Sequence, residues 1–311
     1  MKLKTWGRQW LRRNWPSRSD QTPRSNRAAI AIVNFNTGDL LSHLLFSIFR
    51  VLDRQQLARV VVVDNASTDF SKTFLDHLRK AGLIDVLFND TQRYHGPALN
   101  QAMTYLAGLR RQGLTPSQIF DYVWILDSDT VVLRPDVLKD AVACTEQHRA
   151  GLIGEHQPHK ALPEGYAHVS SILVDPEKVW RRSIAPFEES GAPAKELQIS
   201  LRKQGIVVHD FPFRRHNYIL HLGRGTLARI KESRNEKNRY HQWASEHFHP
   251  HFHGNHDGAQ IHRQFLEVFY TEVPTFSGEA LTAACQRTKP LRLTLPAPAI
   301  APGARPDQHA G

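Results

Sequence analysis

The chain has 311 residues, of which 41% are apolar and 23% are charged, a composition typical of a folded protein with a buried core. No stretch approaches the ~18 uninterrupted apolar residues of a membrane-spanning helix. The two cysteines are too few for a disulfide framework or a cysteine-rich zinc site. The sequence therefore does not fit three classes of protein: intrinsically disordered proteins, integral membrane proteins and small proteins stabilised by disulfides.

The net charge of +10 is concentrated at the N-terminus. Residues 1–27 contain eight Lys or Arg and a single acidic residue, Asp20, so this segment carries most of the excess charge. The remaining chain is close to neutral, whereas a nucleic-acid-binding protein needs a basic face on its folded body. We therefore expect no nucleic-acid partner.

The basic N-terminal segment also contains apolar residues at helical spacing. Leu3, Trp6 and Trp10 fall on one face of a helix among Lys and Arg, as in helices that lie at an anionic membrane surface. A disordered basic tail fits the same composition. Because the segment lacks the apolar core and cleavage site of a secretory signal, we expect a cytoplasmic protein. If residues 1–15 bind lipid, it is peripheral on the inner face of the membrane.

Short apolar runs alternate with helix-period segments from residue 28 to about residue 140. The runs predict buried strands at 28–33, 60–63, 84–88 and 121–126. The apolar stripes between them predict helices over 41–52, 74–78 and 96–109. Strands that alternate with helices indicate βαβ units and a parallel sheet. Residues 28–140 are therefore predicted to form a nucleotide-binding-like α/β half.

The second half of the chain, over 141–284, is less regular. We predict strands at 166–174, 206–208 and 218–221, and a helix over 195–203. Residues 285–311 are rich in Pro and Ala, which predicts a disordered tail.

Polar residues follow each of the predicted strands of the first half. These are Asn34 and Asn36, Asp64 and Asn65, Asn89 and Arg93, and Asp127 and Asp129. Any one of them is most simply a turn residue or a loop cap. Together they predict a polar crevice, because ligands of open parallel sheets lie beyond the carboxyl ends of the strands.

Asp127-Ser128-Asp129 directly follows the apolar run YVWIL. Two carboxylates at the end of a strand can share a divalent cation such as Mn²⁺ or Mg²⁺ and leave coordination positions for diphosphate oxygens. The chain has neither a Gly-x-Gly-x-x-Gly fingerprint nor a Walker-type loop, which disfavours hydride transfer and P-loop chemistry. A cation and diphosphate without a glycine-rich loop point to a nucleotide-sugar donor.

The motifs AIAIVNFNTGDLL, VVVVDNASTD, HGPALNQAM and YVWILDSDTVV resemble the donor half of a family 2 glycosyltransferase, over about 28–140. The resemblance implies a GT-A-like α/β fold, with a Rossmann-like, mostly parallel central sheet flanked by helices and a smaller acceptor-side region. It also implies which residues hold the nucleotide sugar and the metal. Donor-binding candidates are Asn34, Asn36, Asp64, Asn65, Arg93 and Asp127, and Asp129 is a metal ligand.

The acceptor half resembles the family less closely. Where the family carries Glu-Asp-x-x-Leu-x-x-Arg with a catalytic Asp, this chain has Lys195-Glu196 followed by Arg202, so the resemblance places Glu196 as the base. His221, in the segment HLGRGT, corresponds to the histidine that often completes the metal site. The alternative for Glu196 is a solvated helix carboxylate paired with Arg202 or Lys203. The alternative for His221 is a histidine at a strand end whose hydrogen bonds are satisfied there. Glu188 and Glu189 are expected to be structural.

Seven histidines crowd residues 241–262. They could suggest zinc, but no cysteine and no helical His-x₃-His pattern accompanies them. We favour a segment that covers the acceptor site.

The sequence as a whole predicts an inverting, metal-dependent glycosyltransferase. It would move a sugar from a UDP or dTDP donor to a hydroxyl of a glycan or lipid-linked acceptor, as in polysaccharide synthesis at the cell envelope. The alternative is a member that binds a nucleotide sugar or glycan without catalysis, suggested by the departures at Lys195 and Glu196.

Overall fold

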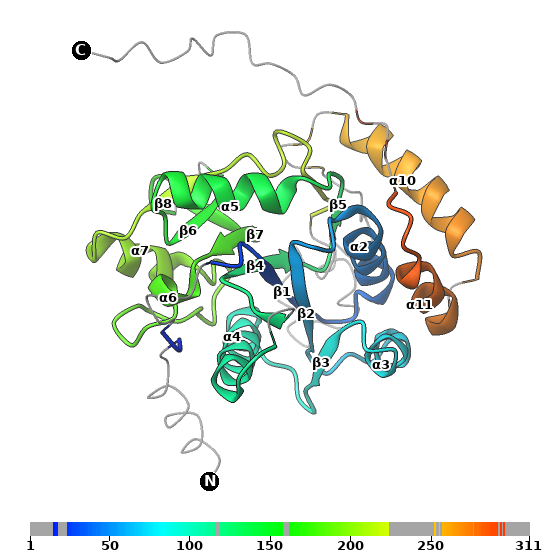
Figure 1. The fold of residues 1–311 in the computed structure, drawn as a ribbon, viewed down its shortest axis with the longest axis horizontal. Coiled ribbons are helices and arrows are strands. Elements are labelled where there is room, and N and C mark those ends of the chain that lie inside the picture. The colour runs from blue at the N-terminus through cyan, green and yellow to red at the C-terminus, as the bar shows by residue number, and fades with distance from the viewer. Residues whose placement is uncertain are drawn as a thin grey trace, which may run out of the picture.

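The computed structural model describes residues 15–17, 24–115, 118–157, 162–223, 252, 255, 257–275, 277–291, 293 and 295. Its centre is a seven-stranded sheet in the order β3-β2-β1-β4-β7-β6-β8 (Figure 1). The strands are β1 (Ala28–Asn34), β2 (Leu57–Asp64), β3 (Asp85–Phe88), β4 (Tyr122–Asp127), β6 (Leu152–His156), β7 (Ala167–Val174) and β8 (Val208–Asp210). A separate two-stranded ribbon pairs β5 (Thr130–Val132) with β9 (Ile219–His221).

The central sheet is mixed but mostly parallel. Strands β3, β2, β1 and β4 pair in parallel, as do β6 and β8, whereas β7 is antiparallel to both of its neighbours. The expected α/β fold with a mostly parallel sheet is confirmed. The reversed strand β7 joins the first half of the chain to the second within one sheet.

Alternate residues of the central strands face two different helical layers. Ile30 and Ile32 belong to a core shared with α2 (Gly38–Val51), α3 (Ser71–Lys80), α5 (Val137–Gln147), α10 (Gly258–Glu272) and α11 (Gly278–Gln286). Ala29 and Ala31 face the other core, which is shared with α4 (His95–Gln112), α6 (Pro176–Val179) and α7 (Lys195–Lys203). Because both faces are covered, the strands read as continuous apolar runs rather than as alternating ones.

The observed elements match most of the predicted ones to within a few residues. The strand predicted at 206–208 lies instead at Val208–Asp210, and the structure adds elements that were not predicted, namely β5, β6, α5, α10 and α11. In α10 and α11, Phe265, Phe269 and Leu281 are buried against the layer of α2 and α3. Helices α10 and α11 from the second half of the chain thus cover the helical layer formed by the first half.

Both ends of the described chain are held against the body. The Trp15 side chain is 5% exposed, its ring packs edge-on against Phe120 at 5.9 Å, and its amide donates to the carbonyl of Trp180. Arg24 donates to the hydroxyl of Tyr122 and to Asp175. Two parts of the basic segment are therefore structural. Residues 1–14 and 18–23 lie outside the described residues.

The segment expected to begin a disordered tail contacts the core. Leu291, Leu293 and Leu295 pack against it, and the amide of Leu291 donates to the carbonyl of Arg50 at 2.6 Å. The composition of 285–311 concealed these leucines among the prolines. Residues 296–311 lie outside the described part of the chain.

Within the described residues, none of the helices combines the length and the apolar character needed to cross a bilayer.

Candidate active site

Two carboxylates and an imidazole meet where β4 ends. Asp127 is the last residue of β4, Asp129 precedes β5, and Thr130 of β5 lies opposite His221 in the β5–β9 ribbon. The amide of Leu222 donates to the carbonyl of Asp129 at 2.9 Å, which fixes the end of β9 beside the turn. The ribbon therefore brings a residue from far along the sequence to the Asp-x-Asp turn.

The ligand atoms of Asp127, Asp129 and His221 all lie within 4.8 Å of one another. The Nε2 atom of His221 is 3.3 Å from Oδ1 of Asp129 and 3.8 Å from Oδ2 of Asp127. Burial opposes a charge on His221, but the hydrogen bond and negative charge of Asp129 outweigh it and raise the pKa of His221.

The same group leaves Asp127 in an unfavourable electrostatic position. Burial raises the pKa of Asp127, and the neighbouring charge of Asp129 adds to that rise, although His95, His221 and Arg214 oppose it. A divalent cation would relieve the repulsion between the two carboxylates. Two carboxylate oxygens and one imidazole nitrogen in close contact form a donor set that Mn²⁺ or Mg²⁺ accepts. The residues present thus fit the expected metal.

A further histidine joins this group, one that the sequence reasoning missed as a site residue. Nε2 of His95, the first residue of α4, lies 3.7 Å from Oδ1 of Asp127. His95 opens the segment HGPALNQAM, and the signal that could have found it is its place at the start of a helix that follows β3 on the same edge of the sheet.

The predicted donor residues Asn34 and Asp64 lie beside one another but are fully buried. The amide of Asn34 donates to Oδ1 of Asp64 at 2.9 Å and to the hydroxyl of Ser67 at 3.0 Å, while its oxygen accepts from Thr37 at 2.8 Å. The hydroxyl of Thr37 in turn lies 2.8 Å from that of Ser128. In this structure Asn34 serves to hold Asp64 and the Asp-x-Asp turn in one network.

Asn36 and Asn65 also make contacts inside the crevice loops. Asn36 lies in the left-handed region with φ 52°, and its side-chain oxygen accepts from the amide of Thr68 at 2.7 Å. Asn65 accepts from the amide of Arg93 at 2.9 Å and donates back to the carbonyl of Arg93. These two asparagines therefore fasten the loops after β1, β2 and β3 to one another, and Arg93 is positioned by Asn65.

A polar cavity of about 560 Å³ lies next to the carboxylate group. Its lining includes Glu196, Glu188, His168 and Tyr166. The ring of His168 is 6.1 Å from that of His221. Burial raises the pKa of Tyr166 to about 12, and the charge of Asp127 contributes to the rise. His168 and Tyr166 thus link the cavity wall to the candidate metal group.

Glu196 lies in the first turn of α7 and faces this cavity. Among the described residues it forms no ion pair with Arg202 or Lys203, and Arg202 donates instead to the carbonyl of Gly165. The simplest alternative for Glu196, a solvated intrahelical pair, is therefore not what the structure contains. Glu188, which we expected to be a surface or structural residue, lines the same cavity and supplies a second carboxylate there.

The loop that carries Glu188 is fastened to α4. The side chain of Asn100 donates to the carbonyl of Phe187 at 2.8 Å and accepts from the amide of Phe187 at 3.0 Å. A Cβ atom at Gly96 would lie 2.0 Å from the carbonyl oxygen of Glu188. Only glycine permits this close approach, which sets the wall of the cavity against the first turn of α4.

Most of the His-rich segment at 241–262 lies outside the described residues. Asn255, which falls within it, donates to the carbonyl of Ile219 at 2.7 Å and accepts from the amide of His221 at 3.3 Å. His262 is in α10 and packs near Phe252. The described part of the segment thus contacts β9, the strand that carries His221.

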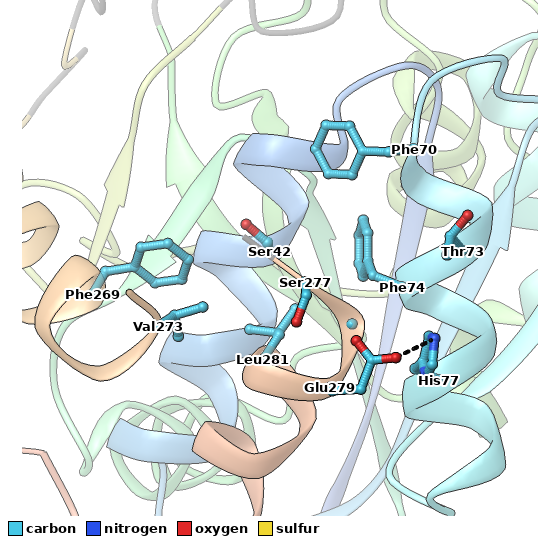
Figure 2. A pocket seen from close by; sticks show the side chains of 11 residues that line it. Ser42, Phe70, Thr73, Phe74, His77, Phe269, Val273, Ser277, Glu279 and Leu281 are labelled. Atoms are coloured by element: carbon cyan, nitrogen blue, oxygen red, sulfur yellow. Dashed lines mark ion pairs between the residues drawn. The ribbon is translucent and has the colours of Figure 1, made fainter. Parts of the chain in front are cut away.

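A second pocket, of about 270 Å³, opens between α2, α3, α10 and α11 (Figure 2). Its walls are largely aromatic and aliphatic, with Phe70, Phe74, Phe269 and Leu281 among them. The carboxylate of Glu279 is engaged with His77 at 3.2 Å. Lacking a cluster of acidic groups, this pocket is not the candidate active site.

The chain was also compared with known proteins. A family model described as Glycosyl transferase family 2 matches residues 29–214. A search of curated proteins found no match. Among solved structures, Staphylococcus aureus TarS 1–349 is 17% identical over 60% of this chain and 61% of its own, with a TM-score of 0.43. The chain thus spans about three fifths of that protein.

Two further structures are similar to this chain. The mannosyltransferase PcManGT from Pyrobaculum calidifontis, in complex with GDP-Man and Mn²⁺, is 19% identical over 91% of this chain and 92% of its own, with a TM-score of 0.47. Glucosyl-3-phosphoglycerate synthase from Mycobacterium tuberculosis is 14% identical over 63% of this chain and 76% of its own, with a TM-score of 0.42.

Proposed function

The chain belongs to glycosyl transferase family 2, as its motifs predicted, and we propose that it is an inverting enzyme that transfers a sugar from a nucleoside diphosphate to an acceptor hydroxyl. The observation that carries the proposal is that His168, which lines the cavity together with Glu196, has its ring 6.1 Å from that of His221 in the Asp127–Asp129–His221 group. A donor bound at the first would present its sugar to an acceptor in the second.

In this proposal Asp129 and His221 hold a divalent cation, with Asp127 beside them and His95 against Asp127. A cation bound there supplies positive charge to the leaving diphosphate. The network from Asp64 through Asn34 and Thr37 to Ser128 keeps the crevice loops in register, so the carboxylates need little rearrangement when donor binds.

Glu196 is our proposed general base. It would take the proton from the acceptor hydroxyl as that oxygen attacks the anomeric carbon from the face opposite the departing diphosphate. A negative carboxylate nearby also favours the oxocarbenium character of the transition state. Support comes from its position in the cavity and from the lack of an ion pair to Arg202 or Lys203 among the described residues.

The test is Glu196→Gln, which keeps the shape of the side chain but removes the base. Turnover of a sugar nucleotide should fall roughly 10²–10⁴-fold while nucleotide affinity measured by calorimetry is retained. Glu189→Gln is the matched control, since Glu189 is exposed and directly follows Glu188 in the same loop. Normal turnover by Glu196→Gln together with a large loss in Glu188→Gln would move the base to Glu188.

The donor and the metal can be tested separately from the base. UDP and dTDP sugars, with and without Mn²⁺, are screened by thermal shift, because a ligand that binds the native state raises its melting temperature. Asp129→Asn should abolish the part of the shift that requires Mn²⁺. Metal-dependent nucleotide binding without product from any glycan or lipid-linked acceptor would favour the non-catalytic alternative.

We further propose that the residues before Trp15 bring the enzyme to an anionic membrane surface on the cytoplasmic side, where a lipid-linked acceptor would be found. Support comes from the sequence, with Trp6 and Trp10 among basic residues. Trp15 and Arg24 are not part of such a surface, since both contact the protein body. Flotation with phosphatidylglycerol vesicles that is equal with and without residues 1–14 would contradict the proposal.

A further inference from the structure

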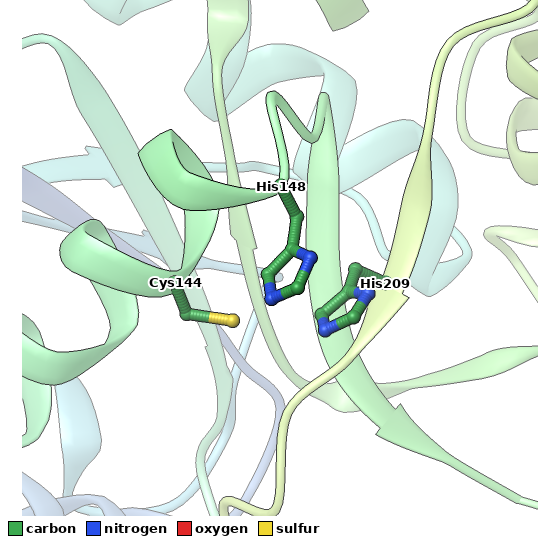
Figure 3. Close-up of side chains that lie close together, drawn as sticks. All are labelled: Cys144, His148 and His209. Carbon is green, nitrogen blue, oxygen red and sulfur yellow. The ribbon is translucent and has the colours of Figure 1, made fainter. Parts of the chain in front are cut away.

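A second group of metal-ligating side chains lies at the edge of the sheet, away from the carboxylate site. It consists of Cys144, His148 and His209, and their ligand atoms all lie within 4.8 Å of one another. The thiol of Cys144 is in the last turn of α5, His148 directly follows that helix, and His209 is the middle residue of β8. Figure 3 shows the sulfur of Cys144 directed toward the ring of His148, with the ring of His209 beside it.

Helix geometry accounts for one pair of this group and sheet pairing for the third member. Residues four apart on a helix lie on the same face, and the amide of His148 still donates to the carbonyl of Cys144 at 3.1 Å. His209 is held opposite Ile153 of β6 by the parallel β6–β8 ladder. The two imidazole rings lie nearly parallel, with centroids 3.7 Å apart and planes inclined by 16°.

We propose that Cys144, His148 and His209 bind a Zn²⁺ ion that joins the end of α5 to the edge strand β8. Thiolate and imidazole are the ligands that zinc prefers, in contrast to the oxygen-rich set of the Asp127–Asp129–His221 group. Cys144 binds as the thiolate, and its proton passes to solvent. The three residues leave one position of a tetrahedral site for water.

The three side chains must draw together, and the stacked rings must reorient, to hold one ion. Zinc–sulfur and zinc–nitrogen bonds of about 2.3 and 2.0 Å place the ligands of one ion closer together than the observed upper limit. The side chain of His148 is exposed, so its ring can turn toward the ion.

The ion would add a link from α5 to a short edge strand that is otherwise held by β6 and by the contacts of Asp210 with His156 and Arg215. Strand β8 has three residues and pairs only with β6 in the described structure. From β8 the chain runs through Phe211 and Phe213 to β9, which carries His221. A Zn²⁺ ion bound by His209 would therefore stabilise the segment that leads into the candidate active site. This inference does not depend on whether the protein transfers sugars.

The test uses the full-length chain, freed of metal and titrated with Co²⁺. A cobalt ion bound by a thiolate gives a sulfur-to-cobalt charge-transfer absorption, which the thiol-free Asp127–Asp129–His221 group cannot produce. We expect one equivalent of Co²⁺ to give this band and one equivalent of Zn²⁺ to remove it. The other cysteine, Cys285, is buried in the core with 0% exposure.

Cys144→Ser should abolish the band, and His148→Ala and His209→Ala should each weaken cobalt binding roughly tenfold or more. His216→Ala, which removes an exposed histidine near Tyr218, is the matched control and should leave binding unchanged. In an Asp129→Asn background, Zn²⁺ should still raise the melting temperature, and Cys144→Ser should remove that rise. Absence of the band in the parent chain, or its persistence in Cys144→Ser, would overturn the proposal.

Discussion

The hydroxyl oxygens of Thr37 and Ser128 lie 2.8 Å apart in the buried interior. Thr37 follows β1, and Ser128 is the central residue of the Asp-x-Asp turn after β4. Because Thr37 also donates to Asn34, which in turn holds Asp64, one hydrogen-bonded chain crosses the carboxyl ends of β1, β2 and β4. The position of the Asp-x-Asp turn thus depends on a residue that carries no charge.

This network predicts the effect of Thr37→Val, which keeps the shape of the side chain and removes its hydroxyl. The buried oxygen of Asn34 would lose its donor, so the free energy of unfolding should fall by about 1–3 kcal/mol. Nucleotide affinity in Mn²⁺ should also weaken, because Ser128 is no longer fixed. Thr37→Ser keeps the hydroxyl and is the control. Urea denaturation and calorimetry measure the two effects, and unchanged values in both would refute the role of the network.

The close approach of α4 to the Glu188 loop predicts the effect of Gly96→Ala. The new Cβ would clash with backbone atoms of Glu188 that cannot move aside as a side chain could. We expect the KM for the acceptor to rise and turnover to fall while nucleotide binding is largely kept.

A control for that substitution exists in the same helix. Gly108 of α4 has no atom within 4 Å of its would-be Cβ. Gly108→Ala should therefore stabilise the protein by about 0.5–1 kcal/mol, the usual gain inside a helix, and leave kinetics unchanged. If both variants behave alike in acceptor kinetics, the contact with Glu188 does not shape the cavity.

A buried ion pair lies close to the candidate metal group. Arg214 and Glu155 are 3.2 Å apart with side chains 5% and 6% exposed, and Glu155 also accepts from the amide of Arg214 at 2.7 Å. Glu155→Gln would remove the closest counter-charge of the buried guanidinium, so we expect a loss of about 3–5 kcal/mol in the free energy of unfolding.

The matched control for the Glu155 variant is an exposed pair, Arg134 with Asp136, at 2.6 Å. Its side chains are 28% and 41% exposed, so Asp136→Asn should cost less than about 1 kcal/mol. Chemical denaturation of both variants makes the comparison. Similar losses in the two would mean that burial does not set the strength of these pairs.

The half-buried His262 predicts how stability depends on pH. Burial lowers the pKa of His262, and its Nε2 atom has no hydrogen-bond partner among the described residues. The unfolded chain takes up this proton near the ordinary pKa of about 6.5, whereas the folded protein resists it. Stability from this residue is therefore complete above that pH and is lost as the pH falls below it.

His262→Leu should reduce the loss of stability between pH 7.5 and 5.5, relative to the parent chain. Urea midpoints at the two pH values measure the difference, and His216→Leu controls for the loss of one exposed histidine. An unchanged pH dependence in His262→Leu would show that protonation of this side chain does not oppose folding.

The donor half could be predicted closely from the sequence because its signals are local. A buried parallel strand such as Val60–Val63 is an apolar run, and the loops that follow these strands meet at one edge by the rules of parallel sheets. The same reasoning placed Asp127 and Asp129 together. The family resemblance assigned Asn34 and Asn36 to nucleotide contacts, which stays a prediction, and in the structure their side chains bond to Asp64, Ser67 and Thr68.

The structure of the second half depends on contacts between residues that are far apart in the chain. Such contacts produce weaker patterns in a sequence, so this half was harder to predict. His221 reaches Asp129 only through the β5–β9 ribbon, whose strands have three residues each. His209 reaches Cys144 through the parallel pairing of β8 with β6. Composition also concealed the packing of Trp15 and Leu291, because each lies in a segment whose other residues are basic or proline-rich. His221 was found by resemblance to a family, and the Cys144 group was not found at all.

Strand β7 has a consequence for how the molecule can move and be divided. It hydrogen-bonds to β4 on one side and to β6 on the other, so the two halves share one sheet, with a register shift between Gly154 and His156 of β6. A rigid-body hinge between the two halves would have to break these strand pairings. For the same reason, a gene cut near residue 145 should yield two insoluble fragments rather than two independently folding modules.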